Sequence, residues 1–153
     1  GSSYEYRYAL VDLARDALSR DHLRTLFGYG PETFFFLHLK REFLGMEYTF
    51  LSCDSSWILS AIETGLTGVS ILAILLGGIF LYQVYNIRNL SGKLKDMMVC
   101  IAAFNLSFLF LMTNVAIYGW VQFGHIYWIL AALSVAIVRI QKNSGEVVEG
   151  MAA

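Results

Sequence analysis

Two carboxylates stand close to the start of a long apolar stretch, where both could do chemistry. Asp54 is followed by two serines, and Glu63 lies two residues before Gly65. Asp54 is either a general base for a substrate hydroxyl or the N-cap of the helix that follows it. Glu63 could serve a substrate path, pair with a neighbouring helix or complement the helix dipole. Both residues are therefore candidate catalytic groups with structural alternatives.

Three arginines upstream of these carboxylates are candidate anion ligands. Arg15, Arg20 and Arg24 belong to a stretch in which positive and negative residues alternate, a pattern typical of a solvated helix face. Arg20 and Arg24 are four residues apart, so on one helix they would share a face and could hold a phosphate. Gly28 and Gly30 then form a turn, which is either an anion nest of backbone N–H groups or simply a turn.

The composition indicates the class of protein. Hydrophobic residues make up 57% of the 153-residue chain and charged residues only 15%, against about a quarter in soluble domains. Most of the charge lies in residues 1–57. A net charge of −1 and the lack of a lysine-arginine run do not favour nucleic-acid binding. Cys53 and Cys100 are expected in different environments, so neither a disulfide nor a zinc site is predicted. The chain is therefore predicted to be an all-α integral membrane protein.

The apolar pattern predicts the elements that position these residues. An amphipathic helix is expected over residues 4–26, an interfacial or buried segment over residues 34–39, and a loop over residues 43–53. Leu66 to Tyr85 carries no charged residue, and about 20 apolar residues are needed to cross about 30 Å of hydrocarbon. Three spans are predicted over residues 66–85, 98–119 and 126–138. The helix that contains the first span is expected to begin near residue 55. A turn at residues 122–125 precedes the third span, which has residue 120 as an alternative start.

Positive residues predict the orientation of the spans. Short loops rich in lysine and arginine lie on the cytoplasmic side, and three spans bring five cations to one side: Arg88, Lys93, Lys95, Arg139 and Lys142. Residues 1–57 then form an extracytoplasmic helical and loop segment, residues 58–142 a three-helix transmembrane region, and residues 143–153 a disordered cytoplasmic tail. The expected location is the bacterial inner membrane. The start at Gly1, without an initiator methionine, favours a fragment of a longer chain.

The order of these features resembles the C-terminal part of the O-antigen ligase and polymerase superfamily. Its members share a turn of the form fGxGxgxf, a segment of the form [HD]NxyLxxxxExGxxG, and two further spans. The resemblance covers about residues 15–138, which would be the last third of a larger GT-C-like multi-span protein. The positions that match the two motifs are Phe27, Gly28, Gly30 and Phe34 in the turn, and Glu63, Gly65 and Gly68 in the second segment.

The resemblance implies a metal-independent membrane glycosyltransferase without a cofactor. It would transfer or polymerise glycan from an undecaprenyl-pyrophosphate carrier onto an acceptor sugar, in O-antigen, capsule or exopolysaccharide synthesis. External arginines would hold the pyrophosphate, and a polar residue would deprotonate the acceptor hydroxyl. Family ligases commonly have His where this chain has Asp54 and Asn where it has Ser55, which favours a polymerase-like or unassigned member over a lipid A-core ligase.

The same resemblance assigns roles and partners. The expected pyrophosphate or glycan ligands are Arg15, Arg20, Arg24, Gly28 and Gly30, and the expected catalytic residues are Asp54, as the base, and Glu63. The expected partners are the lipid-linked glycan, the lipid bilayer, and the missing N-terminal spans or other polysaccharide-assembly proteins.

A second interpretation is a non-catalytic three-span subunit or scaffold. Three helices offer little room for a lipid carrier and a sugar, and glycines at Gly65, Gly68, Gly77 and Gly78 would let a partner helix approach closely. A transporter fragment is a third interpretation. Its cue would be a discontinuous helix, which the sequence does not show clearly.

Overall fold

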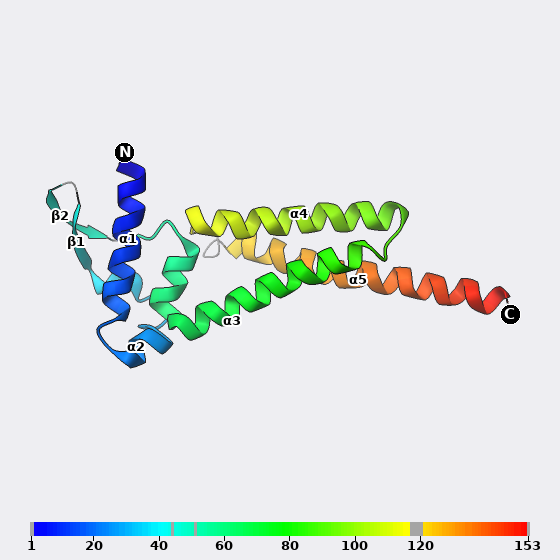
Figure 1. The fold of residues 1–153 in the computed structure, drawn as a ribbon, viewed down its shortest axis with the longest axis horizontal. Helices are drawn as coiled ribbons and strands as arrows, with labels where there is room; N and C mark the ends of the chain where they lie inside the picture. The colour runs from blue at the N-terminus through cyan, green and yellow to red at the C-terminus, as the bar shows by residue number, and fades with distance from the viewer. Residues whose placement is uncertain (1, 44, 51, 117–120, 153) are drawn as a thin grey trace. The chain divides into compact units, whose positions relative to one another are not determined.

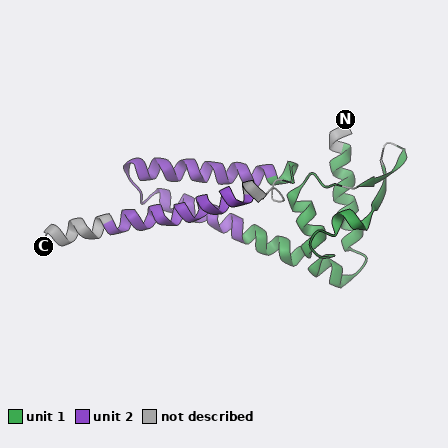
Figure 2. Ribbon diagram, turned by 180° about the vertical axis from the view of Figure 1, so that it is seen from behind, with its two compact units in different colours: residues 1–74, 112–119 green, residues 75–111, 120–153 purple. Residues whose placement is uncertain are grey.

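The structure is a computed structural model that describes residues 2–43, 45–50, 52–116 and 121–152, with the backbone alone at 2–4, 43, 121–123 and 144–152. The chain divides into two compact units, residues 1–74 with 112–119 and residues 75–111 with 120–153 (Figure 2). The elements (Figure 1) are mostly helices: α1 (Ser2–Leu18), α2 (His22–Phe27), a 3-10 helix η1 (Phe34–Leu37), β1 (Leu39–Phe43), β2 (Met46–Phe50), α3 (Ser56–Ile87), α4 (Gly92–Asn114) and α5 (Val121–Ala152).

In the first unit, the apolar face of α1 packs into the core. Leu10, Leu13 and Ala17 are buried there in one cluster with Phe34 and Phe50. These side chains come from α1, η1 and β2, which are far apart in the sequence. Burial of apolar area contributes about 25 cal/mol per Å² to folding, so this cluster holds the three elements together.

The single helix predicted over residues 4–26 is wrong, because two helices occupy that range. α1 ends at Leu18, and the carboxylate of Asp21 accepts a hydrogen bond from the N–H of Leu23 at 3.1 Å, which makes Asp21 the N-cap of α2. Aspartate is among the best N-cap residues. The hydroxyl of Thr25 also donates to the carbonyl of Leu18 at 2.7 Å and so fixes the corner between the helices.

Residues 43–53, predicted as a loop, contain part of a β-hairpin. β1 and β2 pair antiparallel, with Leu39 opposite Phe50. Gly45 takes a positive φ of 78° at the turn between them. The aromatic and β-branched residues of β2 favour a strand, and this signal was missed in the sequence.

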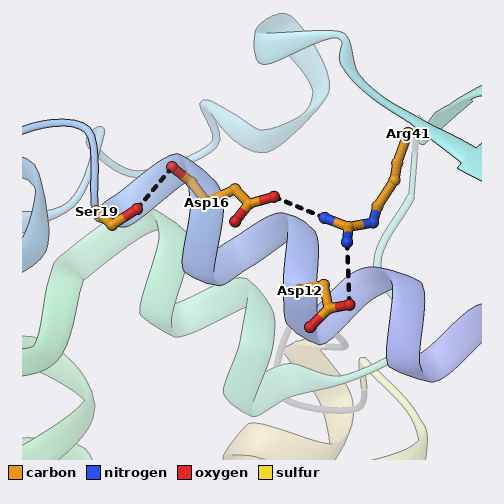
Figure 3. A network of polar contacts seen from close by, with 4 residues as sticks. All are labelled: Asp12, Asp16, Ser19 and Arg41. Carbon is orange, nitrogen blue, oxygen red and sulfur yellow. Dashed lines mark hydrogen bonds and ion pairs between the residues drawn. The ribbon is translucent and has the colours of Figure 1, made fainter.

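Arg41 fastens the hairpin to α1 (Figure 3). Its guanidinium donates to the carboxylates of Asp16, at 2.6 Å, and Asp12, at 3.1 Å, while the hydroxyl of Ser19 donates to the backbone carbonyl of Asp16. The planar guanidinium can hold two carboxylates at once, which gives the contact a defined orientation. The alternating charges of α1 are therefore partly used to bind the hairpin.

α3 confirms the predicted first span and its start near residue 55, but it is interrupted. Gly65 has φ 67° and ψ −173°, which are not helical, so the helix bends there. The carbonyls of Ile62 and Glu63, which precede the interruption, accept hydrogen bonds from the N–H groups of Tyr29 and Gly30, each at 2.9 Å. The structure therefore contains the discontinuous helix that the sequence does not show clearly.

In the second unit, α4 and α5 pack with the later part of α3. Tyr127 is buried, its hydroxyl donates to the carbonyl of Leu76 at 3.2 Å, and its ring lies 4.9 Å from that of Phe108. Gln83 and Asn105 are also buried, and the amide of Asn105 donates to Gln83 at 2.9 Å. Amide pairs of this kind hold transmembrane helices together.

Three helices of the described residues are long and apolar enough to cross a membrane: Ser56–Ile87, Gly92–Asn114 and Gly124–Asn143. The class of multi-pass, mostly helical membrane protein is thereby confirmed. The turn predicted at residues 122–125 is wrong, because α5 begins at Val121. Its backbone is helical to Ala152, where the sequence predicts a tail, and no proline interrupts it. The alternative start at residue 120 lies outside the described residues.

The second unit brings the turn after α3 and the end of the third span to one end, while their cytoplasmic orientation stays a prediction. Asn86 and Asn89, at the end of α3 and in the following turn, line one depression together with Val138 and Lys142 of α5. The turn between α3 and α4 and residues 138–142 therefore lie at the same end of this unit. This is the arrangement that the positive-loop rule requires.

Candidate functional site: a cavity beside the start of α3

The two sequence motifs meet backbone to backbone in the first unit. A Cβ atom on Gly28 would lie 2.5 Å from the carbonyl of Glu63, and one on Gly65 would lie 2.4 Å from the carbonyl of Leu26. Both glycines also have positive φ, 70° and 67°, a conformation that other residues rarely adopt. Only glycine fits at either position, and the structure thus brings Gly28, Gly30, Glu63 and Gly65 together.

Glu63 connects this junction to η1. Its half-buried carboxylate accepts hydrogen bonds from the backbone N–H groups of Phe34 and Glu32. The hydroxyl of Thr33 donates to the carbonyl of Gly30 at 2.6 Å, which closes the same turn. Backbone donors occupy the carboxylate of Glu63, so the geometry gives this residue a positioning role, and its predicted catalytic role stays a prediction.

Ser55, and not Asp54, caps α3. The hydroxyl oxygen of Ser55 accepts a hydrogen bond from the N–H of Ile58 at 3.4 Å, and its carbonyl accepts the first helical bond from Leu59. The same hydroxyl lies 3.4 Å from the carbonyl of Met112, to which it donates. The N-cap alternative for Asp54 is therefore wrong, and its exposed carboxylate takes no part in capping this helix.

Asp54 lines a cavity of about 250 Å³ between α1, the start of α3 and the end of α4. Its wall is mostly apolar, with one positive and one negative side chain. The middle of α1 and the residues around the start of α3 contribute most of it, and the end of α4 contributes the rest. The lining residues are Arg7, Leu10, Val11, Asp54, Ser55, Trp57, Ile58, Thr113 and Asn114.

Tyr6 lies close to the same carboxylate. Burial, and then the negative charge of Asp54, raises the pKa of Tyr6 above its ordinary value of 10.0. Its hydroxyl donates to the carbonyl of Ser52 at 3.3 Å. The phenol therefore stays protonated at neutral pH and places a neutral side chain near Asp54.

The arginine of this cavity is Arg7, which the sequence analysis did not select. Arg7, Leu10 and Val11 lie at positions i, i+3 and i+4 of α1, so they share one helix face. That spacing was the available signal. Among the lining residues, Arg7 alone carries a positive charge, and it faces the same space as Asp54.

None of the three arginines predicted as ligands lines this cavity. Arg15 is an exposed residue of α1, and Arg20 is exposed in the turn after it. The break between α1 and α2 means that Arg20 and Arg24 do not share a helix face as predicted. Arg24 lies 5.0 Å from the ring centroid of Tyr29 and donates to the carbonyl of Gly28 at 3.4 Å. It supports the glycine turn.

Cys53 stands beside Asp54 but is not suited to be a nucleophile. It is buried, and its thiol donates to the carbonyl of Ser55 at 3.3 Å. Burial raises the pKa of Cys53 from 9.0 to about 11, so the reactive thiolate is scarce at neutral pH. In the described residues, no group of three or more His, Cys, Asp or Glu side chains could hold a metal ion.

Comparisons of this chain with protein-family models, with curated proteins and with solved structures found no match.

Proposed function

We propose that this chain is the C-terminal portion of a membrane glycosyltransferase. It would transfer or polymerise glycan from an undecaprenyl-pyrophosphate carrier onto an acceptor sugar at the extracytoplasmic face of a bacterial inner membrane. The observation that carries the proposal is the cavity beside the start of α3 that both Arg7 and Asp54 line. The direct contact between Gly28 and Gly65 supports it, because the two motifs of the resembling superfamily form one junction.

The proposed reaction needs one base and one cation. The hydroxyl oxygen of the acceptor sugar attacks the anomeric carbon of the donor, and its proton passes to the carboxylate of Asp54. The bond between that carbon and the pyrophosphate oxygen breaks, and the leaving undecaprenyl pyrophosphate takes the electron pair. Arg7 neutralises the negative charge that develops on the pyrophosphate, since a fixed cation stabilises such a transition state. Asp54 later releases its proton to water.

The volume of the cavity limits the size of the ligand that this chain can bind by itself. Its volume of about 250 Å³ is just below the range of about 300–1,000 Å³ that is common for small-molecule sites. It has room for a single sugar ring next to Asp54. In the proposed enzyme, the rest of the glycan and the lipid tail are held by the bilayer and by other spans or assembly proteins.

The choice between arginines gives a direct experiment. Arg7→Ala should reduce glycan transfer about 10²–10³-fold, because a charge-stabilising group at the leaving group is lost. Arg20→Ala, which removes an exposed arginine of the same unit, should change the rate less than about twofold. The measurement is transfer of labelled glycan in membranes with matched amounts of each variant. Loss of transfer in Arg20→Ala together with full activity in Arg7→Ala would overturn the assignment of Arg7.

A further inference from the structure

A group of large apolar side chains is exposed on α2 and η1 of the first unit. Their exposed fractions range from 48% to 73%. The members on α2 lie at positions i, i+3 and i+4 and so share one helix face, and the two on η1 are in contact with their rings 5.6 Å apart. We call this group the apolar rim: Leu23, Leu26, Phe27, Phe35 and Phe36.

Both elements of the apolar rim are fixed to the point where the charge-free part of α3 begins. The carbonyl of Leu26 packs on Gly65, and the N–H of Phe34 donates to the carboxylate of Glu63. Figure 1 shows α2 beside the bend of α3. From Leu66 the chain has no charged residue for a full membrane thickness. The apolar rim is therefore held beside the start of the charge-free part of α3.

The side chains around the apolar rim are those of a membrane interface. Arg20 lies two residues before α2, and Arg24 lies within it beside the ring of Tyr29. Aromatic residues at the headgroup level, next to cations that face anionic lipids, are typical of interfacial segments. The hairpin of the same unit differs, because it exposes an ion pair between Lys40 and Glu47.

We propose that α2 and η1 form an interfacial anchor whose apolar rim inserts into the phospholipid bilayer around the entry point of α3. The occupant of this surface is the boundary between the lipid headgroups and the acyl chains. The anchor would hold the cavity of Arg7 and Asp54 at the membrane surface. It is independent of glycosyl transfer, and an inactive protein would show it equally.

Depth measurements with a spin label on single cysteines test this anchor in the full chain. The chain is reconstituted in vesicles of phosphatidylcholine and phosphatidylglycerol. Three positions of the first unit are equally exposed in the structure: Phe36 on η1 at 73%, Met46 on the hairpin at 71% and Ile74 in the span at 75%. Each is replaced by cysteine in a Cys100→Ala background, and Phe27→Cys reports on α2. Cys53 is buried and its raised pKa keeps it unlabelled, which the background chain alone verifies.

The expected result is a graded depth. Labels at Phe27 and Phe36 should collide more with oxygen than with a polar nickel complex and lie about 5–10 Å into the boundary between headgroups and acyl chains. The label at Ile74 should lie deeper, and the label at Met46 should be aqueous. The anchor would be overturned if the labels at Phe27 and Phe36 collided with the nickel complex as often as the label at Met46 does. Labels shielded from both reagents would also overturn it, because protein would then cover the apolar rim.

Discussion

Asp54→Asn should reduce glycan transfer about 10²–10⁴-fold, because the amide cannot accept the proton of the acceptor hydroxyl and a positioned base contributes about that much. The substitution keeps the shape of the side chain. Asp54 is exposed and does not cap α3, so stability should be little changed. The measurement is the initial rate of transfer from a labelled lipid-linked donor, with protein abundance in the membrane determined in parallel.

A matched control removes a different exposed carboxylate of the same unit. Glu47→Gln changes a residue of the hairpin, where the carboxylate of Glu47 pairs with the exposed ammonium of Lys40 at 3.2 Å. Exposed ion pairs contribute about 0–1 kcal/mol, so this variant should fold and transfer glycan like the parent. Equal activity of Asp54→Asn and Glu47→Gln would show that Asp54 is not the base.

Gly65→Ala should destabilise the first unit by at least about 3 kcal/mol. The new Cβ would lie 2.4 Å from the backbone of Leu26, and the backbone angles of φ 67° and ψ −173° belong to a region that costs other residues about 1–3 kcal/mol. Because the clash is with backbone, no side-chain rotation relieves it. The measurement is the free energy of unfolding in detergent, followed by circular dichroism. Gly28→Ala should behave alike, since its Cβ would meet Glu63 at 2.5 Å.

The control for this prediction is another glycine of the same helix. Gly78 has regular helical surroundings, and nothing lies within 4 Å of a Cβ placed there. Gly78→Ala should leave stability unchanged or raise it by up to about 1 kcal/mol, because alanine is the better helix former. A Gly65→Ala variant as stable as Gly78→Ala would contradict the close backbone contact between the two motifs.

The membrane class and the spans could be predicted because they depend on local composition. A run such as Leu66 to Tyr85 needs no partner in the chain to be recognised as a span. The start of α3 could also be predicted, since a polar stretch is followed by an apolar one near Ser55. The conformation of Gly65 could not be predicted, because it depends on Gly28, which lies 37 positions earlier in the chain. The turn at Gly28 supplies the N–H groups that bond to the carbonyls before the interruption.

In the candidate site, too, some features could be predicted from the local sequence and others depend on tertiary contacts. Asp54 stands out as a polar residue before a span, but two neighbouring residues can both cap a helix, and only geometry selects Ser55. Arg7 was not selected because its charge resembles the others of a solvated helix. Its spacing to Leu10 shows a shared face but not that α3 and α4 form a cavity with that face. Arg20 and Arg24 were misplaced by an N-cap at Asp21 that divides the predicted helix.

The most direct measurement is the release of undecaprenyl pyrophosphate from a labelled lipid-linked glycan by the full-length protein in vesicles, with and without an acceptor sugar. The proposed glycosyltransferase predicts release that requires the acceptor and is lost in Asp54→Asn. Release no greater than that of Asp54→Asn would contradict the enzyme. The chain would then be a three-span subunit.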